Sequence, residues 1–358
     1  MEVFSMKNTI LAALLMLSIA ALVFTGCSKK DETMSTTAEK GSEKVTEAKL
    51  VIYTYDSFAS DWGPANSVIP PFEEKYGIGV ELKSAGDSGQ VLSRVILEKE
   101  NPEADIIIGI DNNMLAKALS EDVLEVYKPE NISKVYKHLV FDNSFHAIPF
   151  DYGYFAVNYD SAALDSPPVS LEDLTKPEYA DSLILMDPRT SSPGLGFLLW
   201  TVAVYGDNFA DYWKRLKPSI LTITDGWDSG YGLYTAGEAP MVLSYTTSPP
   251  YHVEYEETDR FKALIFEEGN YMQIESMGII KGAPHRSNAE KFIEYMLTDD
   301  FQQAIPLTNF MMPVSSETSL PASFDYAPVS DKPLLLDTVD IEENLDSWIA
   351  TWLEASVN

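Results

Sequence analysis

The side chains with the clearest binding chemistry are aromatic residues in segments broken by glycine or proline. Trp227 follows a glycine after a short apolar run. Tyr245 and Tyr251 flank Pro249 and Pro250 after another such run. Proline is excluded from central strands, so the chain must leave the sheet there. Ligands of open α/β sheets bind outside the carboxyl ends of strands, so we expect these rings to lie at a binding site. Aromatic faces attract positive charge, and we therefore expect a flat, cationic ligand.

Four residues near the ends of earlier predicted strands are further candidates for the site. Tyr55 and Trp62 come just after the first strand, where an aromatic residue is also a normal part of a core. Asp87 precedes an amphipathic run and also fits a helix N-cap. Asp111 ends a buried strand, where a carboxylate needs partners or solvent.

Ser191 and Ser192 precede Pro193 at the predicted start of a helix. Serine before proline is a common helix cap, because proline is tolerated as the first helical residue. The same position also presents backbone N–H groups to an anion such as phosphate. Both interpretations remain open for the two serines.

The sequence contains no convincing catalytic or metal-binding set. Its four histidines are scattered, and no H-E-x-x-H or Gly-x-Ser-x-Gly pattern is present. Paired tyrosines bind ferric iron in some proteins, but Tyr245 and Tyr251 are separated by two prolines. We therefore expect a binding protein without a resident metal or cofactor, and not an enzyme.

The formal net charge of −30 excludes one large class of partners. Nucleic acid requires Lys and Arg to neutralise phosphates, and acidic residues greatly outnumber basic ones here. The charges of the first 49 residues cancel, so the excess lies on the folded part. Such a field suits a cationic ligand, although solubility explains it equally well.

Residues 1–27 have the pattern of an export signal. The apolar core of this signal is too short to predict a membrane-spanning helix. The signal itself ends at Cys27, the only cysteine of the sequence. This resembles a bacterial lipoprotein signal, so we expect Cys27 to be lipidated and to anchor the protein to a membrane. A plain secretory signal is the alternative. Residues 28–49 are polar and predict a flexible tether.

The remaining residues predict an α/β fold. Apolar strand-like runs alternate with amphipathic helical runs, which is the pattern of a mostly parallel sheet flanked by helices. Two long β-rich runs, at residues 147–157 and 271–280, interrupt the alternation and fit chain crossings between two lobes. We assign residues 50–150 and 272–300 to lobe 1, and residues 151–271 and 301–358 to lobe 2.

Eight segments, in order, carry a resemblance to a known family: YTYDSFASDWGP, GIDNN, IPFDYGYFAVNYD, DPRTSSPGLGFLLW, GWDSGYGLY, VLSYTTSPPYH, EGNYMQIE and AIPLTNFMMPV. Between about residue 50 and residue 320 the chain resembles the periplasmic thiamine-binding proteins of ABC importers. The resemblance implies a two-lobed periplasmic-binding-protein fold of type II, with the ligand at the lobe interface. It also implies thiamine or its phosphate esters as ligand, with a permease and an ATPase as partners.

The same resemblance suggests roles for four of the candidates. Tyr55 and Trp62 match family residues at the site in the first lobe. Asp87 aligns with an acidic residue that meets the aminopyrimidine. Ser191 lies in the segment that approaches the hydroxyethyl or phosphate end of the ligand.

In the second lobe, Trp227, Tyr245 and Tyr251 match the family's aromatic wall. Phe310 stands where the family pattern has Trp, so one stacking contact differs: Phe keeps an aromatic face but has no N–H donor.

Two alternatives compete with this assignment. Thiamine-degrading enzymes with a similar fold use a cysteine nucleophile, but Cys27 lies in the predicted signal. The same binding fold with ferric iron or a polyamine as ligand is the other alternative.

Overall fold

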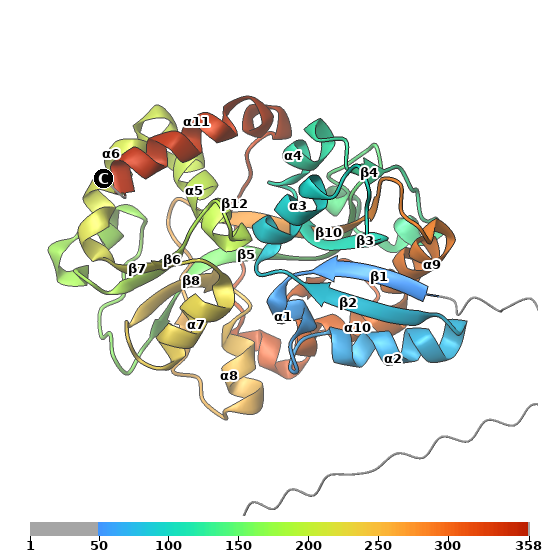
Figure 1. Ribbon diagram of the computed structural model, residues 1–358. Helices are drawn as coiled ribbons and strands as arrows, with labels where there is room; N and C mark the ends of the chain where they lie inside the picture. Colours follow the sequence, from blue (N-terminus) through green and yellow to red (C-terminus); the bar gives the residue numbers. More distant parts are fainter. Residues whose placement is uncertain (1–48, 357–358) are drawn as a thin grey trace, which may run out of the picture. The chain divides into compact units, whose positions relative to one another are not determined.

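The computed structural model describes residues 49–356 (Figure 1). The predicted signal peptide, Cys27 and residues 28–48 of the predicted tether lie outside this range. Between residues 49 and 356, no helix combines the length and the apolar character needed to cross a bilayer.

The described strands form a sheet whose main path runs β2-β1-β3-β10-β5-β8-β6-β7. These strands are β1 (Lys49–Thr54), β2 (Gly79–Ser84), β3 (Ile106–Asp111), β5 (Ile148–Asp160), β6 (Leu183–Met186), β7 (Ile220–Thr224), β8 (Met241–Tyr245) and β10 (Asn270–Ile280). Four short strands pair with β5 or β10 beside this path: β4 (Leu124–Glu125), β9 (Phe261–Ala263), β11 (Met312–Pro313) and β12 (Pro333–Leu334).

Strands β5 and β10 join two parallel groups. Strand β1 pairs in parallel with β2 and β3, and β6 pairs in parallel with β7 and β8. Strand β5 runs antiparallel to β10 along its first half and antiparallel to β8 along its second half. These are the two crossing strands that the sequence predicts, and the fold is the expected two-lobed α/β arrangement.

Helices cover the faces of both groups (Figure 1). Around β1, β2 and β3 they are α1 (Asp56–Ala59), α2 (Ala65–Tyr76), α3 (Ser88–Leu97), α4 (Leu115–Ser120), α9 (Arg286–Met296) and α10 (Asp299–Thr308). Around β6, β7 and β8 they are α5 (Ser192–Tyr205), α6 (Phe209–Leu216), α7 (Trp227–Thr235) and α8 (Pro249–Tyr255). Short 3₁₀ helices occupy several of the connections: Glu130–Lys134, Lys137–Leu139, Glu172–Thr175, Pro177–Tyr179, Gly206–Asn208, Lys217–Ser219 and Ala322–Tyr326.

The last helix, α11 (Thr338–Ser356), packs against α6 and also against α4. Its Trp352 is 1% exposed and meets Trp213 of α6 edge to face, with ring centroids 5.9 Å apart. Because α11 contacts elements of both predicted lobes, it ties them together. The residue boundaries of the lobes stay predictions.

The starts of three helices agree with the local sequence signals. Asp87 caps α3 in a capping box with Gln90, and Ser191 caps α5. Helix α8 begins at Pro249, where the chain leaves β8. These starts place polar and aromatic side chains at the carboxyl ends of β2, β6 and β8.

Candidate functional site

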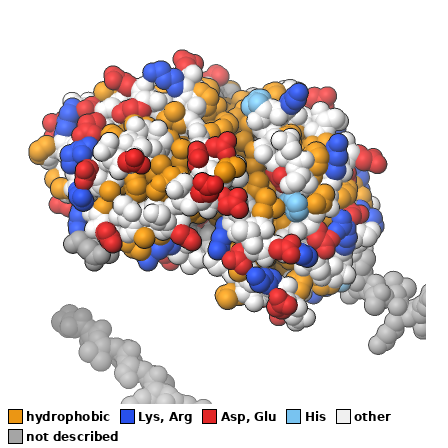
Figure 2. Space-filling model, turned by 90° about the horizontal axis from the view of Figure 1, so that it is seen from above, with side chains coloured by type: hydrophobic (Ala, Val, Ile, Leu, Met, Phe, Trp, Pro, Cys, Tyr) orange, Lys and Arg blue, Asp and Glu red, His pale blue; other side chains and the backbone are white. Residues whose placement is uncertain are grey.

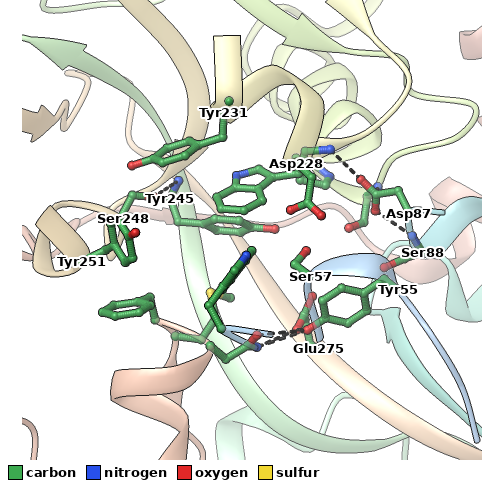
Figure 3. Close-up of a pocket in the computed structure, with 18 of the residues that line it drawn as sticks. Tyr55, Ser57, Asp87, Ser88, Asp228, Tyr231, Tyr245, Ser248, Tyr251 and Glu275 are labelled. Atoms are coloured by element: carbon green, nitrogen blue, oxygen red, sulfur yellow. Dashed lines mark hydrogen bonds between the residues drawn. The ribbon is translucent and has the colours of Figure 1, made fainter. Parts of the chain in front are cut away.

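A cavity of about 410 Å³ lies at these strand ends (Figure 3). Its volume falls within the range of small-molecule sites. Residues from both parallel groups and from the segment after α10 line it: Tyr55, Ser57, Trp62, Asp87, Ser88, Ser192, Pro193, Trp227, Asp228, Tyr231, Gly232, Thr235, Tyr245, Ser248, Tyr251, Glu256, Glu275, Asn309, Phe310 and Met311.

Most of the residues singled out from the sequence meet at this cavity. Those that line it are Tyr55, Trp62, Asp87, Ser192, Trp227, Tyr245, Tyr251 and Phe310. Asp111 and Ser191 are not among the lining residues. What each lining residue does to a ligand stays a prediction.

Asp111 is fully buried, and its side chain stabilises the turn that follows β3. Its carboxylate accepts hydrogen bonds from the backbone N–H groups of Asn113 (2.9 Å) and Met114 (3.0 Å) and from Gln273 Nε2 (2.8 Å). Burial raises the pKa of Asp111 to about 6, against the effect of these donors. The structure therefore gives this carboxylate internal partners and keeps it away from the cavity.

Ser191 is the N-cap of α5, as predicted from its position before Pro193. It is 2% exposed, and its hydroxyl accepts a hydrogen bond from the backbone N–H of Gly194 at 3.4 Å. The neighbouring Ser192 reaches the cavity instead.

Trp227 presents a flat ring whose orientation is fixed from two sides. Its Nε1 donates to Ser244 Oγ at 2.9 Å, and its ring stacks on Tyr231 with centroids 4.7 Å apart and planes 18° apart. Trp62, which is 47% exposed, faces it at 6.1 Å from the other parallel group. Sequence reasoning missed Tyr231, although its i,i+4 spacing from Trp227 places both on one face of a helix.

Tyr231 is itself held by a buried histidine. Its hydroxyl lies 2.8 Å from His252 Nε2, and His252 Nδ1 lies 2.7 Å from Glu256 Oε2. Because a carboxylate only accepts, Nδ1 carries the proton and Nε2 accepts from the tyrosine. Burial lowers the pKa of His252, so the ring is neutral near pH 7 and the directions of both hydrogen bonds are fixed.

Tyr55 enters the cavity next to a carboxyl group. Its ring lies over Gly109 of β3, where φ is +106° and an added Cβ would stand 2.3 Å from Tyr55 Cδ1. Its hydroxyl donates to Glu275 Oε2 at 2.9 Å (Figure 3). Asn309 Nδ2 donates to the same hydroxyl at 3.2 Å. Glu275 and Asn309 are lining residues that the sequence did not indicate, because both lie in otherwise apolar or mixed runs.

The remaining aromatic residues form the opposite side of the cavity. Tyr245 packs its ring on Phe155 at 5.2 Å. Tyr251 meets Phe310 edge to face at 5.4 Å. Phe310 is 9% exposed, and its backbone has a positive φ of 51°, which is uncommon for a residue with a side chain.

Asp87 bridges the two parallel groups. Its Oδ1 accepts from the backbone N–H of Ser88 at 2.6 Å and of Ser192 at 3.4 Å, and its Oδ2 accepts from that of Trp227 at 3.0 Å. These N–H groups are at the starts of α3, α5 and α7, where helix dipoles favour a negative charge. Burial nevertheless raises the pKa of Asp87 above its ordinary value.

The lining is acidic and aromatic. It includes the carboxyl groups of Asp87, Asp228, Glu256 and Glu275, and none of the described lining residues is Lys or Arg. Across residues 49–356, no cluster of three or more His, Cys, Asp or Glu could hold a metal ion. Such a cavity is suited to an organic cation, which aromatic faces and carboxylates both attract.

Comparisons with known proteins agree with this chemistry. A family model, Bacterial extracellular solute-binding protein, matches residues 101–338. The Thiamine-binding periplasmic protein of Brucella abortus is 42% identical over 86% of this chain and 92% of its own length. The protein of that name from Escherichia coli K12 is 38% identical over 86% and 93%. A solved Periplasmic thiamin binding protein superposes with a TM-score of 0.82 at 37% identity, over 86% of this chain and 96% of that one.

Proposed function

This chain belongs to the bacterial extracellular solute-binding proteins, and on that basis we propose that it captures thiamine and its phosphate esters for an ABC importer. In this proposal it is exported, binds the vitamin outside the cytoplasm, and delivers it to a permease driven by an ATPase. It makes and breaks no bond in the ligand.

One observation carries the proposal: aromatic faces from both parallel groups converge on a cavity whose lining has four carboxyl groups and, within the described chain, no Lys or Arg. Thiamine joins a permanently charged thiazolium to a flat aminopyrimidine. A desolvated cation on an aromatic face gains about 2 kcal/mol. Two such faces supply a useful share of the roughly 12 kcal/mol of a nanomolar complex.

Titration calorimetry with thiamine tests the proposal directly. We expect binding with a dissociation constant below about 1 µM and quenching of tryptophan fluorescence, because Trp62 and Trp227 line the cavity. Chromatography of the ligand after incubation should recover thiamine unchanged. Absence of both heat and quenching at micromolar thiamine would exclude this function.

A polyamine is the second candidate, because the four lining carboxyl groups suit an ammonium chain as well as a thiazolium. Spermidine and putrescine titrated under the same conditions separate the two ligands. We expect both to bind far more weakly than thiamine, since an aliphatic chain has no flat ring to stack on Trp227. Tighter binding of spermidine than of thiamine would favour the second candidate.

The proposal includes a lipid anchor at Cys27, which rests on the sequence pattern of residues 1–27. Labelling cells with a fatty-acid analogue tests it. We expect incorporation into the natural chain and none into Cys27→Ser. Incorporation into both chains, or into neither, would contradict the anchor without affecting the ligand.

A further inference from the structure

Two buried carboxyl groups face each other on the crossing strands. Asp151 of β5 is the register partner of Glu275 of β10. Asp151 is 0% exposed and Glu275 is 4% exposed, and only Glu275 is a lining residue of the cavity. Glu275 therefore forms part of the cavity wall at the junction of the two parallel groups, and Asp151 is its partner across the two strands.

The hydrogen-bond donors around the pair are neutral. Tyr55 Oη donates to Glu275 Oε2 at 2.9 Å, and Asn309 Nδ2 donates to Asp151 Oδ2 at 2.6 Å. Within the described chain, Asp151 Oδ1 has no hydrogen-bond partner. A buried carboxyl oxygen without a donor is costly when it is charged and much less costly when the carboxyl group holds a proton.

The ionisable groups that face the pair add no positive charge. They are Asp111 from β3, Tyr55 after β1 and Tyr245 from β8. The pKa values of both tyrosines are held well above their ordinary value by burial, so these phenols are neutral near pH 7. Two adjacent carboxylates without a cation cannot both ionise at little cost. Burial raises the pKa of Asp151 to about 7, and burial together with the neighbouring Asp151 raises the pKa of Glu275 well above its ordinary value.

We propose that the Asp151–Glu275 pair selects for positive charge in the ligand: it holds a shared proton when the cavity is empty and releases that proton when a permanent cation binds. The proton leaves a carboxyl O–H group for the solvent, and the ligand ring keeps its charge. Tyr55 and Asn309 then donate to the resulting carboxylates without moving. This inference rests on the proposed function, since it takes the thiazolium as the cation.

Calorimetry in two buffers measures the released proton. Thiamine is titrated at pH 7 in phosphate and in Tris, whose ionisation enthalpies differ strongly. We expect the heats to differ by an amount equal to about half to one proton released per bound thiamine. The control ligand is a neutral analogue in which a thiophene replaces the thiazolium. It keeps the aminopyrimidine, so any proton exchange by that ring cancels, and we expect no release.

Variants identify the source of the proton. Glu275→Gln and Asp151→Asn should each abolish the buffer dependence, and Glu275→Gln should reduce the preference for thiamine over the neutral analogue by about tenfold. Asp228→Asn, which alters another carboxyl group of the same lining, should keep the proton release whatever its affinity. Binding of the neutral analogue verifies that each variant is folded.

The outcomes separate this inference from the proposed function. Wild-type protein that gives no heat with thiamine overturns both. Tight binding with identical heats in the two buffers overturns only the role of the pair. If Glu275→Gln and Asp151→Asn release as many protons per bound thiamine as the wild type, the role of the pair is also overturned. Should neither variant fold, the comparison of thiamine with the neutral analogue on the wild-type protein still decides.

Discussion

Trp227 illustrates how single side chains are prepared for a ligand before it arrives. Its N–H group is bonded to Ser244, and one of its faces is covered by Tyr231, which His252 in turn holds. The indole thus loses little rotational freedom on binding. A ring that is already fixed contributes more of its stacking energy to affinity.

Replacing Trp227 by Ala should therefore weaken thiamine binding by about ten- to a hundredfold, since a cation–aromatic contact of about 2 kcal/mol is lost. Calorimetry measures the change. Trp348→Ala on α11 is a matched control, because Trp348 packs against the core and is not a lining residue of the cavity. Equal affinities of Trp227→Ala and the wild type would show that this ring does not contact the ligand.

The contrast between Trp227 and Glu275 shows what the sequence could predict of the site. A ring after a glycine at a strand end is visible in the sequence, and so is a proline that forces the chain out of a sheet. Glu275 lies inside a continuous strand whose residues are all buried. Its importance comes from pairing with Asp151, which is 124 positions away, and strand register is set by packing across the whole sheet.

Strands and helices were more predictable than their contacts. The prolines after Tyr245 predict that the chain leaves the sheet after β8, and the starts of α3 and α5 follow from local caps. The contact of α11 with both α4 and α6 does not, because it depends on tertiary packing of a helix with apolar residues on one face. The partners of Asp111 could not be predicted for the same reason: Gln273 lies on the neighbouring strand β10, 162 positions later in the sequence.

Helix α5 packs so closely on β5 that one of its glycines has no room for a side chain. A Cβ on Gly196 would stand 1.9 Å from Phe155 Cε2, and Phe155 is fully buried. Gly196→Ala should lower the free energy of unfolding by about 1–3 kcal/mol. Gly232→Ala in α7, where nothing lies within 4 Å of the added atom, should raise it by about 0.5–1 kcal/mol. Urea unfolding measures both, and equal effects would contradict the packing.

The crossing strands should make the empty protein less stable at higher pH. Folding raises the pKa of Asp151 from 3.8 to about 7. Such an acid contributes stability below pH 4, and this contribution is lost as the pH rises through 7. In the wild-type protein, the free energy of unfolding should therefore fall by on the order of 2–4 kcal/mol between pH 4 and pH 8, and Asp151→Asn should lack this fall.

Asp142 provides the control for this pH effect. Burial raises its pKa, but hydrogen bonds from Ser144, Ala147 and His146 outweigh burial and bring the pKa below 3.8. Asp142→Asn should therefore lower stability by a similar amount throughout pH 5–8. Thermal unfolding of the ligand-free variants across this range gives the comparison, and an unchanged slope in Asp151→Asn would contradict the expectation.

The described part of the molecule holds its two parallel groups together around the cavity. Asp87 accepts hydrogen bonds from the starts of α5 and α7, which belong to the other parallel group. The rings of Trp62 and Trp227 face each other between the same two groups. Acidic side chains are spread over the face seen in Figure 2, in keeping with the net charge of −30. A cation is drawn toward such a surface, whereas an anion is repelled.

This charge distribution predicts an order among the proposed ligands. Thiamine should bind most tightly, thiamine monophosphate less tightly, and the diphosphate least, with steps of about tenfold. Each phosphate adds negative charge to a lining with four carboxyl groups and, among the described residues, no Lys or Arg. The N–H groups of Ser192 and Trp227, at the starts of α5 and α7, are already bonded to Asp87.

Competition against thiamine, followed by tryptophan fluorescence, measures this order. Glu256→Gln removes one negative charge from the rim of the cavity, where the side chain is 42% exposed. It should reduce the difference in affinity between thiamine and the diphosphate. Glu254→Gln, two residues earlier on α8 and not a lining residue, should leave that difference unchanged. Equal affinity for all three ligands would mean that Asp87 yields the helix starts to the phosphate, and that acidic charge does not set the preference.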